Sequence, residues 1–389
     1  MNVVTSEKVP IKLWLDDIED GAMQQAKNLA NLPFIYKHLA IMPDSHQGYG
    51  MPIGGVLATS GVIIPNAVGV DIGCGMCAVK SNLTDISKDG LMAITGAIRD
   101  VIPLGFNHQE EPQDKKLMPA ESDVIYDTSK VVCGEYNNAL KQLGTLGGGN
   151  HFIEIQKGSD GFIWIMIHSG SRNLGKKVAD HYNKIAVKLN RLWYSSVPKE
   201  HELAFLPIET NEAKDYYKEM QYCVKFALAN RSLMMDRIKI CFTDYTNQVV
   251  FGDMINIAHN YARWEHHFGQ EVIVHRKGAT AARVGEVGLI PGSMGTKSYV
   301  VEGLGNPESF WSCSHGAGRK MGRKQAQRIL SLGDEIKKMD EQGIIHGMRN
   351  QSDLDEASGA YKDIDEVMEN QKDLVKILVE LKPIAVIKG

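Results

Sequence analysis

Residues 162–170 read FIWIMIHSG, a short apolar run that is closed by turn residues. This pattern is typical of a buried strand that ends at a functional site. Working outward, four other short segments present either metal-type ligands or phosphate-type loops. They read VGVDIGCGM (68–76), GTLGGGNHFIEI (144–155), HNYA (259–262) and SHGAGR (314–319).

The polar residues of these segments form a candidate ligand set of one carboxylate, one thiol and three imidazoles. They are Asp71, Cys74, His151, His168 and His259. This mixture suits Mn, Fe, Co or Zn better than Mg or Ca. Glycines surround nearly all of these residues, and bare backbone can approach a phosphate and offer its N–H groups. A site for metal and phosphate is therefore the first hypothesis.

Each candidate also has a simpler explanation. Cys74 beside Asp71 could be a buried thiol next to a capping carboxylate, and the histidines could be core residues with satisfied hydrogen bonds. A redox pair of Cys74 and Cys77 is disfavoured, because no strand and helix of the thioredoxin type follow the pair.

Length and composition narrow the class of protein. A chain of 389 residues forms one large domain or two closely packed ones. With 43% hydrophobic and 23% charged residues it has the composition of a globular protein. Its net charge of −4 excludes a protein that binds polyanions over its whole surface. We expect no signal peptide, no membrane span and, from the scattered cysteines, a cytoplasmic location.

The periodicity predicts an α+β fold. We expect helices over residues 20–31, 83–101, 176–193, 209–247, 320–340 and 363–381. Strands are expected in 34–43, 271–283, 297–303 and 383–389, and a polar loop over 106–125. Because the ligands come from distant segments, we expect one catalytic unit over residues 1–389 with a mainly helical insert at 176–250.

Three further segments bear on phosphate binding. Arg172 follows the histidine of HSGSR and offers a bidentate phosphate donor. Residues 291–298, PGSMGTKS, have the composition of a phosphate-binding loop but lack the Walker A spacing. The RKGAT segment (276–280) contributes Arg276 and Lys277, for which an exposed basic turn is the alternative.

His315 is the only nucleophile-capable side chain in the middle of SHGAGR. A histidine can attack phosphorus and form a phosphoramidate. The alternatives are a sixth metal ligand or an acid–base group.

These segments together resemble the RtcB family of RNA ligases. The resemblance runs from about residue 33 to the C-terminus and includes PGSMGTKSYVV, AYKDIDEVM and the final VIKG. It implies an α+β fold of the family's own type. It also implies a GTP- and Mn-dependent enzyme that joins RNA 3′-phosphate or 2′,3′-cyclic phosphate ends to 5′-hydroxyl ends, in RNA repair or splicing.

The resemblance further implies a role for each motif residue. The five ligands would hold two Mn ions with Cys74 bridging, and His315 would attack the α-phosphate of GTP and carry GMP. RNA phosphates would be bound by Arg172, Arg276, Lys277 and Arg319. The GTP or GMP pocket would be formed by Asn150, His151, Phe152, Ile153, Glu154, His259, Asn260, Pro291, Gly292, Ser293, Met294, Ser298, His315, Gly316, Ala317, Gly318, Tyr361 and Lys388.

Elementary chemistry agrees with three of these roles. Glu154 can accept from the guanine N1–H and 2-amino groups, which adenine does not present together. Tyr361 offers a stacking face, and Lys388 can donate to a guanine oxygen or a phosphate.

Departures from the family pattern indicate a divergent branch. Residues 43–50 read PDSHQGYG, where valine is usual at position 45, and residues 105–111 read GFNHQEE, which is acidic. RNA ends are the expected partner, an archease-like activator is a candidate second partner, and we expect a monomer. The alternatives are a binuclear phosphoesterase, which needs neither His315 nor the guanine pocket, and a non-catalytic RNA-binding scaffold, which predicts broken motifs.

Overall fold

The computed structural model describes residues 1–120 and 122–389, so residue 121 of the predicted polar loop lies outside it. Two large β-sheets form the centre of the molecule. In the six-stranded sheet only β2 and β3 are parallel among the described strand pairs. Its strand order is β1 (Asn2–Val4), β2 (Ile11–Leu13), β3 (Ile35–His46), β4 (Ile53–Thr59), β12 (Gln270–Lys277) and β11 (Asn260–His267).

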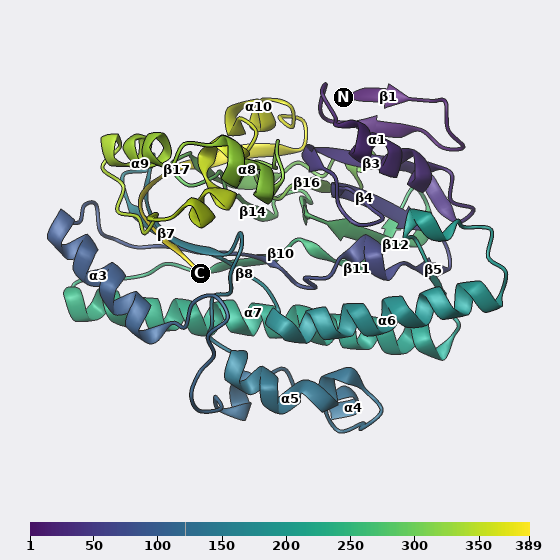
Figure 1. The fold of residues 1–389 in the computed structure, drawn as a ribbon, viewed down its shortest axis with the longest axis horizontal. Helices are drawn as coiled ribbons and strands as arrows, with labels where there is room; N and C mark the ends of the chain where they lie inside the picture. The colour runs from purple at the N-terminus through teal and green to yellow at the C-terminus, as the bar shows by residue number, and fades with distance from the viewer. Residues whose placement is uncertain (121) are drawn as a thin grey trace.

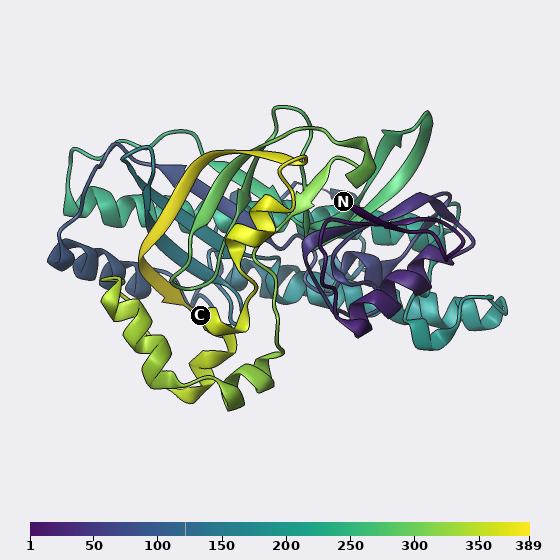
Figure 2. The same cartoon turned by 90° about the horizontal axis from the view of Figure 1, so that it is seen from above.

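The second sheet has seven strands, and all its neighbouring pairs are antiparallel. Its order is β10 (Ile255–Ala258), β6 (Gly75–Lys80), β8 (Ile163–Ser169), β7 (Phe152–Gly158), β17 (Val375–Lys388), β15 (Ser298–Gly303) and β14 (Val287–Ile290). The sheet curls on itself, since Met76 and Met166 near one edge share a core with Leu289 and Val300 near the other. Figure 2 shows β17 as a strongly curved yellow band.

Two long helices, α6 (Arg172–Leu192) and α7 (Asn211–Tyr245), run side by side along one side of the molecule (Figure 1). Together with α3 (Lys88–Val101), α7 covers one face of the seven-stranded sheet. Alternation along β8 explains the arrangement, because Ile165 and Ile167 pack against these helices while Met166 points to the other face. His168 has the parity of Met166 and therefore points away from the helices.

The remaining elements are short. Two strand pairs join β13 (Ala279–Ala281) to β16 (Ser312–Ser314) and β5 (Val62–Ile63) to β9 (Leu206–Pro207). The other α-helices are α1 (Asp20–Ala30), α2 (Pro65–Val68), α4 (Ser122–Ile125), α5 (Val131–Gln142), α8 (Arg323–Ile329), α9 (Leu332–Glu341) and α10 (Ile364–Glu369). The 3₁₀ turns are η1 (Lys115–Leu117), η2 (Lys199–His201), η3 (Pro307–Ser309), η4 (Gln351–Glu356) and η5 (Ser358–Ala360).

The predicted α+β class is confirmed, but one predicted helix is wrong. Residues 363–381 were expected to be helical, whereas α10 ends at Glu369 and β17 begins at Val375. Leu374, Ile377, Leu378 and Leu381 imitate helical spacing, but residues 375–381 pair with β15, and the same strand pairs with β7 from Leu381 onward. Tertiary pairing and β-branched residues thus override a local pattern.

The segment predicted as a mainly helical insert, 176–250, contains most of α6, all of α7, η2 and β9. α7 packs in two hydrophobic clusters that also include sheet residues. None of the helices in the described ranges combines the length and apolar character that crossing a membrane requires.

Candidate metal and nucleotide site

The antiparallel register of the seven-stranded sheet gathers the predicted metal ligands at one edge. His168 in β8 lies opposite the second residue of β6 and the first residue of β7. Cys74 immediately precedes β6, His151 precedes β7 and His259 follows β10, whose last residue pairs with the first of β6. In antiparallel neighbours the start of one strand lies beside the end of the next, so residues distant in sequence meet here.

The five side chains make one continuous cluster. The Cys74 Sγ lies 3.4 Å from the His151 Nε2 and 3.3 Å from the His168 Nε2. The His259 Nε2 is 3.5 Å from that of His168, and the Asp71 Oδ2 is 3.2 Å from that of His151. Cys74 belongs to two groups of three donors, each group within 4.8 Å.

The protonation chemistry of this cluster fits a divalent metal ion. Burial and neighbouring imidazoles hold the pKa values of His168 and His259 well below their usual range, so both rings are in the neutral, metal-binding form. Burial and the Asp71 charge raise the pKa of the Cys74 thiol, an effect that a bound cation reverses. The Asn150 carbonyl oxygen, 2.9 Å from the His168 Nδ1, accepts its N–H and leaves Nε2 as the donor atom.

His315 follows β16 and packs against this cluster. Its ring centroid is 4.6 Å from that of His259. The fully buried Asp44, on β3, places its Oδ2 2.6 Å from the His315 Nδ1 and 3.1 Å from the His315 backbone N. A carboxylate oxygen accepts this bond, so the Nδ1 of His315 is the donor, and in the neutral ring the lone pair lies on Nε2.

The glycine at position 318 is required for this close approach. Gly318 has φ +74°, and a Cβ there would lie 2.1 Å from the Asp44 carbonyl oxygen. Only glycine satisfies both conditions. The segment after His315 can therefore wrap closely around the strand that carries Asp44.

A second group of predicted residues forms a polar cluster around Glu154. The Gln156 side-chain amide donates to the Glu154 Oε2 at 2.7 Å and to the Ser298 hydroxyl at 3.2 Å. The Gly292 N–H donates to the same hydroxyl, which links β7 to the 291–298 loop. Burial raises the pKa of Glu154 to about 8. The Lys388 amine, at the end of the adjacent β17, donates to the Gly149 carbonyl at 2.6 Å.

A sequence model of the family described as "tRNA-splicing ligase RtcB" matches residues 25–389. The chain belongs to the RtcB family. It is 40% identical to the RNA-splicing ligase RtcB of Escherichia coli (strain K12), an alignment that covers 100% of this chain and 99% of that protein. It is 33% identical to the tRNA-splicing ligase RtcB of Nanoarchaeum equitans (strain Kin4-M), in an alignment that covers 98% of this chain and 95% of that protein.

Not every residue predicted from the RtcB resemblance presents its side chain to the site. Ile153, Met294 and Ala317 pack in hydrophobic clusters, which leaves only their backbone for a nucleotide. Asn260 uses its side chain internally, donating to the Asp71 carbonyl and accepting from the Gly278 N–H. Phe152 contacts the His168 ring at 5.6 Å between centroids. Pro291 lies against the backbone of Gly316, since a Cβ added at Gly316 would be 3.4 Å from the Pro291 carbonyl oxygen.

Two of the predicted RNA-phosphate donors are engaged inside the protein. Arg276 is fully buried, and its guanidinium is bound by Glu265 at 2.6 Å, so it has no surface to offer RNA. Lys277 is 6% exposed, and its amine donates to the Tyr49 and Asn66 carbonyls. Burial lowers the pKa of Lys277 to about 7. In this RtcB chain the RKGA segment therefore includes the end of β12, where both cations have partners within the protein.

The two other predicted donors differ from each other. Arg319 is held by Glu356 at 3.0 Å and contacts the Tyr361 ring and hydroxyl. Arg172 binds Thr145 through Nε and the Gly105 carbonyl through one terminal nitrogen. Its other terminal nitrogen has no hydrogen-bond partner among the described residues. This nitrogen and the His151 Nδ1 both lie close to Gly147, where a Cβ would be 2.2 and 2.3 Å from them. Arg172 therefore has a donor beside the ligand cluster.

Sequence reasoning about the RtcB motifs missed four functional candidates. Asp44 was visible in the PDSH motif but had no assigned partner, because its contact with His315 spans 271 positions. Gln156, described above, belongs to none of the predicted ligand or nucleotide motifs. The same holds for Asn230 and Arg231, which are described below. They became visible only through their hydrogen bonds.

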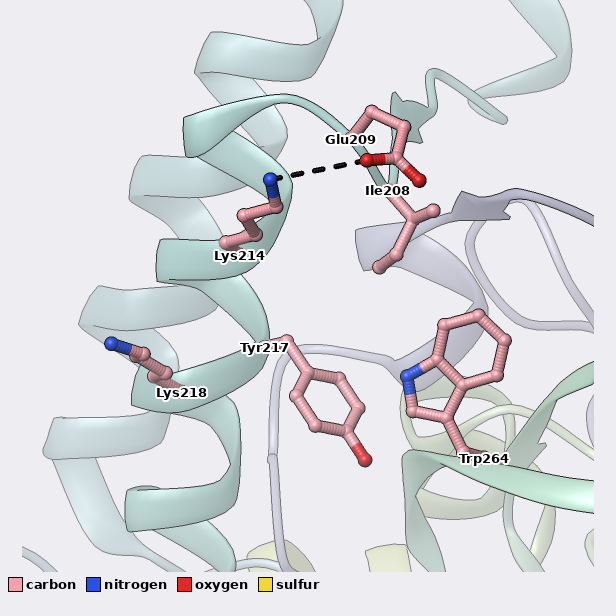
Figure 3. A pocket seen from close by; sticks show the side chains of 6 residues that line it. All are labelled: Ile208, Glu209, Lys214, Tyr217, Lys218 and Trp264. Carbon is pink, nitrogen blue, oxygen red and sulfur yellow. Dashed lines mark ion pairs between the residues drawn. The ribbon is translucent and has the colours of Figure 1, made fainter.

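A surface cleft of about 320 Å³ lies elsewhere, between the start of α7 and β11 (Figure 3). Tyr217 and Trp264 line its walls, with Lys214 and Lys218 on the α7 side. None of the predicted site residues lines it.

Proposed function

We propose that this RtcB-family protein is a GTP-dependent RNA ligase that joins 3′-phosphate or 2′,3′-cyclic phosphate ends to 5′-hydroxyl ends through a histidine–GMP intermediate. The observation that carries the proposal is the position of His315. Asp44 fixes its Nδ1–H, and its ring lies 4.6 Å from a member of the ligand cluster. A histidine oriented in this way is a nucleophile with its lone pair available.

The proposed chemistry has three steps. The His315 Nε2 attacks the α-phosphorus of GTP, an N–P bond forms and pyrophosphate leaves. An oxygen of the RNA 3′-phosphate then attacks the same phosphorus, so the N–P bond breaks and an RNA–phosphate–GMP end forms. Finally the 5′-hydroxyl attacks the 3′-phosphorus, its proton passes to solvent, and GMP leaves. A cyclic phosphate is first opened by water.

Asp44 supports the first step electrostatically. Attack by Nε2 makes the imidazole cationic, and the buried carboxylate at 2.6 Å stabilises that charge. The same contact prevents Nδ1 from acting as a competing nucleophile. Asp44 is thus proposed to orient His315 in every catalytic cycle.

Asp71, Cys74, His151, His168 and His259 are proposed to hold two divalent metal ions, with the thiolate of Cys74 shared. When bound, such ions neutralise phosphate charge and stabilise the leaving pyrophosphate. The identity of the ions as Mn is part of the proposal. The donor set of thiolate, imidazole and carboxylate suits Mn, Fe, Co or Zn better than Mg or Ca.

Glu154, Ser298 and Lys388 are proposed to read the base. The Glu154 carboxylate accepts a hydrogen bond from the Gln156 amide, and burial raises its pKa. The guanine N1–H and 2-amino groups supply two donors, which favour the ionised form. Adenine lacks this pair and leaves the carboxylate unsatisfied, which is the basis for discrimination.

The experiment uses two short RNAs, one with a 5′-hydroxyl and one ending in a 3′-phosphate, a 2′,3′-cyclic phosphate or a 3′-hydroxyl. With Mn and GTP we expect joined product from the first two ends and none from the 3′-hydroxyl. A binuclear phosphoesterase, the alternative, would open the cyclic phosphate or remove the phosphate without GTP and without joining. An arm with an archease-like protein tests whether an activating partner is needed.

A further inference from the structure

Arg231 is a buried cation close to the ligand-bearing segments. It lies on α7, is fully buried, and is surrounded by oxygen acceptors of the strands that carry the metal ligands. One terminal nitrogen donates to the carbonyls of Gly73 at 3.0 Å and Ser169 at 2.8 Å. The other donates to the Ile257 carbonyl at 3.2 Å, and Nε donates to the Asn256 side chain at 2.8 Å.

These acceptors are not scattered. Gly73 precedes Cys74, Ser169 follows His168, and Ile257 lies two residues before His259. One guanidinium therefore joins the three backbone segments from which three proposed ligands project. An arginine suits this task because its donors form a rigid planar fork.

The neighbouring Asn230, also fully buried, extends the same network to a fourth segment. Its Oδ1 accepts from the backbone N–H groups of Gly144 and Thr145, at the start of the loop that leads to His151. Its Nδ2 donates to the Thr145 carbonyl, the Ser169 hydroxyl and the Gly170 carbonyl. All the side-chain hydrogen-bonding capacity of Asn230 is directed at ligand-bearing segments.

The backbone of α7 presses against the same region. Gly73 has φ +74°, and a Cβ there would lie 2.9 Å from the Val224 Cα and 3.1 Å from the Cys223 carbonyl oxygen. The helix can approach the turn that carries Cys74 only because residue 73 is glycine. Asn230 and Arg231 therefore act from a rigid element that is already in contact with the ligand segments.

Charge alone does not explain an arginine at this position. A buried cation beside the cluster repels incoming divalent cations, so its electrostatic effect on metal binding is unfavourable. What an arginine adds is the number and geometry of its donors. We propose that Asn230 and Arg231 are positioning residues that hold the four ligand-bearing segments in the metal-binding arrangement before metal arrives. The proposal rests on the metal centre proposed above.

The test compares Arg231→Lys, which keeps the charge but loses the fork, with Asn256→Ala. The second variant removes the acceptor of the Arg231 Nε, together with the hydrogen bonds that the Asn256 amide donates to the Leu228 carbonyl and the Ser232 hydroxyl of α7. Met220→Ala is the control. It removes a fully buried side chain from the same helix, in a cluster that contains none of the proposed ligands. For each protein we would measure thermal unfolding, Co²⁺ affinity, and the thiolate-to-cobalt absorption band, which reports ligand geometry independently of ligase activity.

We expect Arg231→Lys to weaken Co²⁺ binding about 10–100-fold and to shift the absorption band, as loss of groups that orient metal ligands commonly does. Asn256→Ala should change both in the same direction to a smaller extent. Met220→Ala should lower the unfolding temperature and leave affinity and spectrum unchanged. If Arg231→Lys does not fold, Asn256→Ala decides the question by the same measurements.

Two results would overturn the positioning role. One is wild-type affinity and spectrum in Arg231→Lys or Asn256→Ala, and the other is an equal loss in Met220→Ala, which would indicate general destabilisation. Failure of the wild-type protein to bind Co²⁺ would instead refute the metal centre itself. The two failures are therefore distinguishable.

Discussion

Replacing Asp44 by Asn tests the orientation of His315 with almost no change in volume. The carboxylate oxygen accepts from both the side chain and the backbone N–H of His315, at 2.6 and 3.1 Å. An amide can supply one neutral acceptor in its place, but it cannot stabilise a cationic imidazole. The prediction is a slower first step in a protein that folds and binds metal normally.

The size of the effect follows from the type of bond. A hydrogen bond to a charged group contributes about 1.5–3 kcal/mol. Since each 1.36 kcal/mol corresponds to a factor of ten in rate, Asp44→Asn should slow guanylylation of His315 by about 10–150-fold. The effect should fall on the rate constant of labelling and not on metal content.

The assay is single-turnover labelling of the protein with α-labelled GTP, with bound metal measured in parallel. Ser45→Ala is a matched control, because Ser45 is the next residue and its buried hydroxyl has no partner among the described residues. It should label at the wild-type rate. Wild-type labelling by Asp44→Asn would refute the orienting role. A loss of bound metal together with labelling would show that Asp44 acts through the fold instead.

The remaining predictions concern the metal and guanine sites. Cys74→Ala should lose most of its bound metal on gel filtration, because Cys74 is common to both donor groups. The control Cys223→Ala, which changes another buried cysteine, should keep its metal. Equal metal content in the two variants would contradict a shared thiolate. Because the ionised Glu154 binds guanine and its pKa is about 8, GTP affinity should rise about 8-fold from about pH 6.5 to about pH 7.5, well below the pH at which the guanine N1–H is itself lost. Glu154→Gln should remove this rise in calorimetric titrations and reduce the preference for GTP over ATP; a pH dependence that persists in the variant would exclude Glu154 as its source.

The sequence predicted the α+β class and the segments that meet at the ligand cluster. It could do so because strand-end histidines and glycine turns are local signals. The pairing that gathers them is not local. His168 lies beside His259 because β8 and β10 both pair with β6, and no spacing in the chain encodes that neighbourhood.

The differences between expectation and structure have physical causes of the same kind. Arg276 and Lys277 look like an exposed basic turn, but Arg276 meets Glu265 from the adjacent strand, and Lys277 meets carbonyls that are more than 200 positions away. The start of β17 looks helical because its leucines follow helical spacing, yet it pairs with β15 and continues into the part of the strand that pairs with β7. A single sequence gives the type of side chain, whereas availability to a ligand depends on tertiary partners.

The most direct test of the account is covalent labelling of the wild-type protein. It would be incubated with Mn and α-labelled GTP, denatured, digested, and the labelled peptide identified. The account predicts a label that is released by acid, is stable to alkali and maps to His315, and that is absent from His315→Ala with metal binding retained. No label on a protein that binds metal, or a label on another residue, would contradict the proposed mechanism.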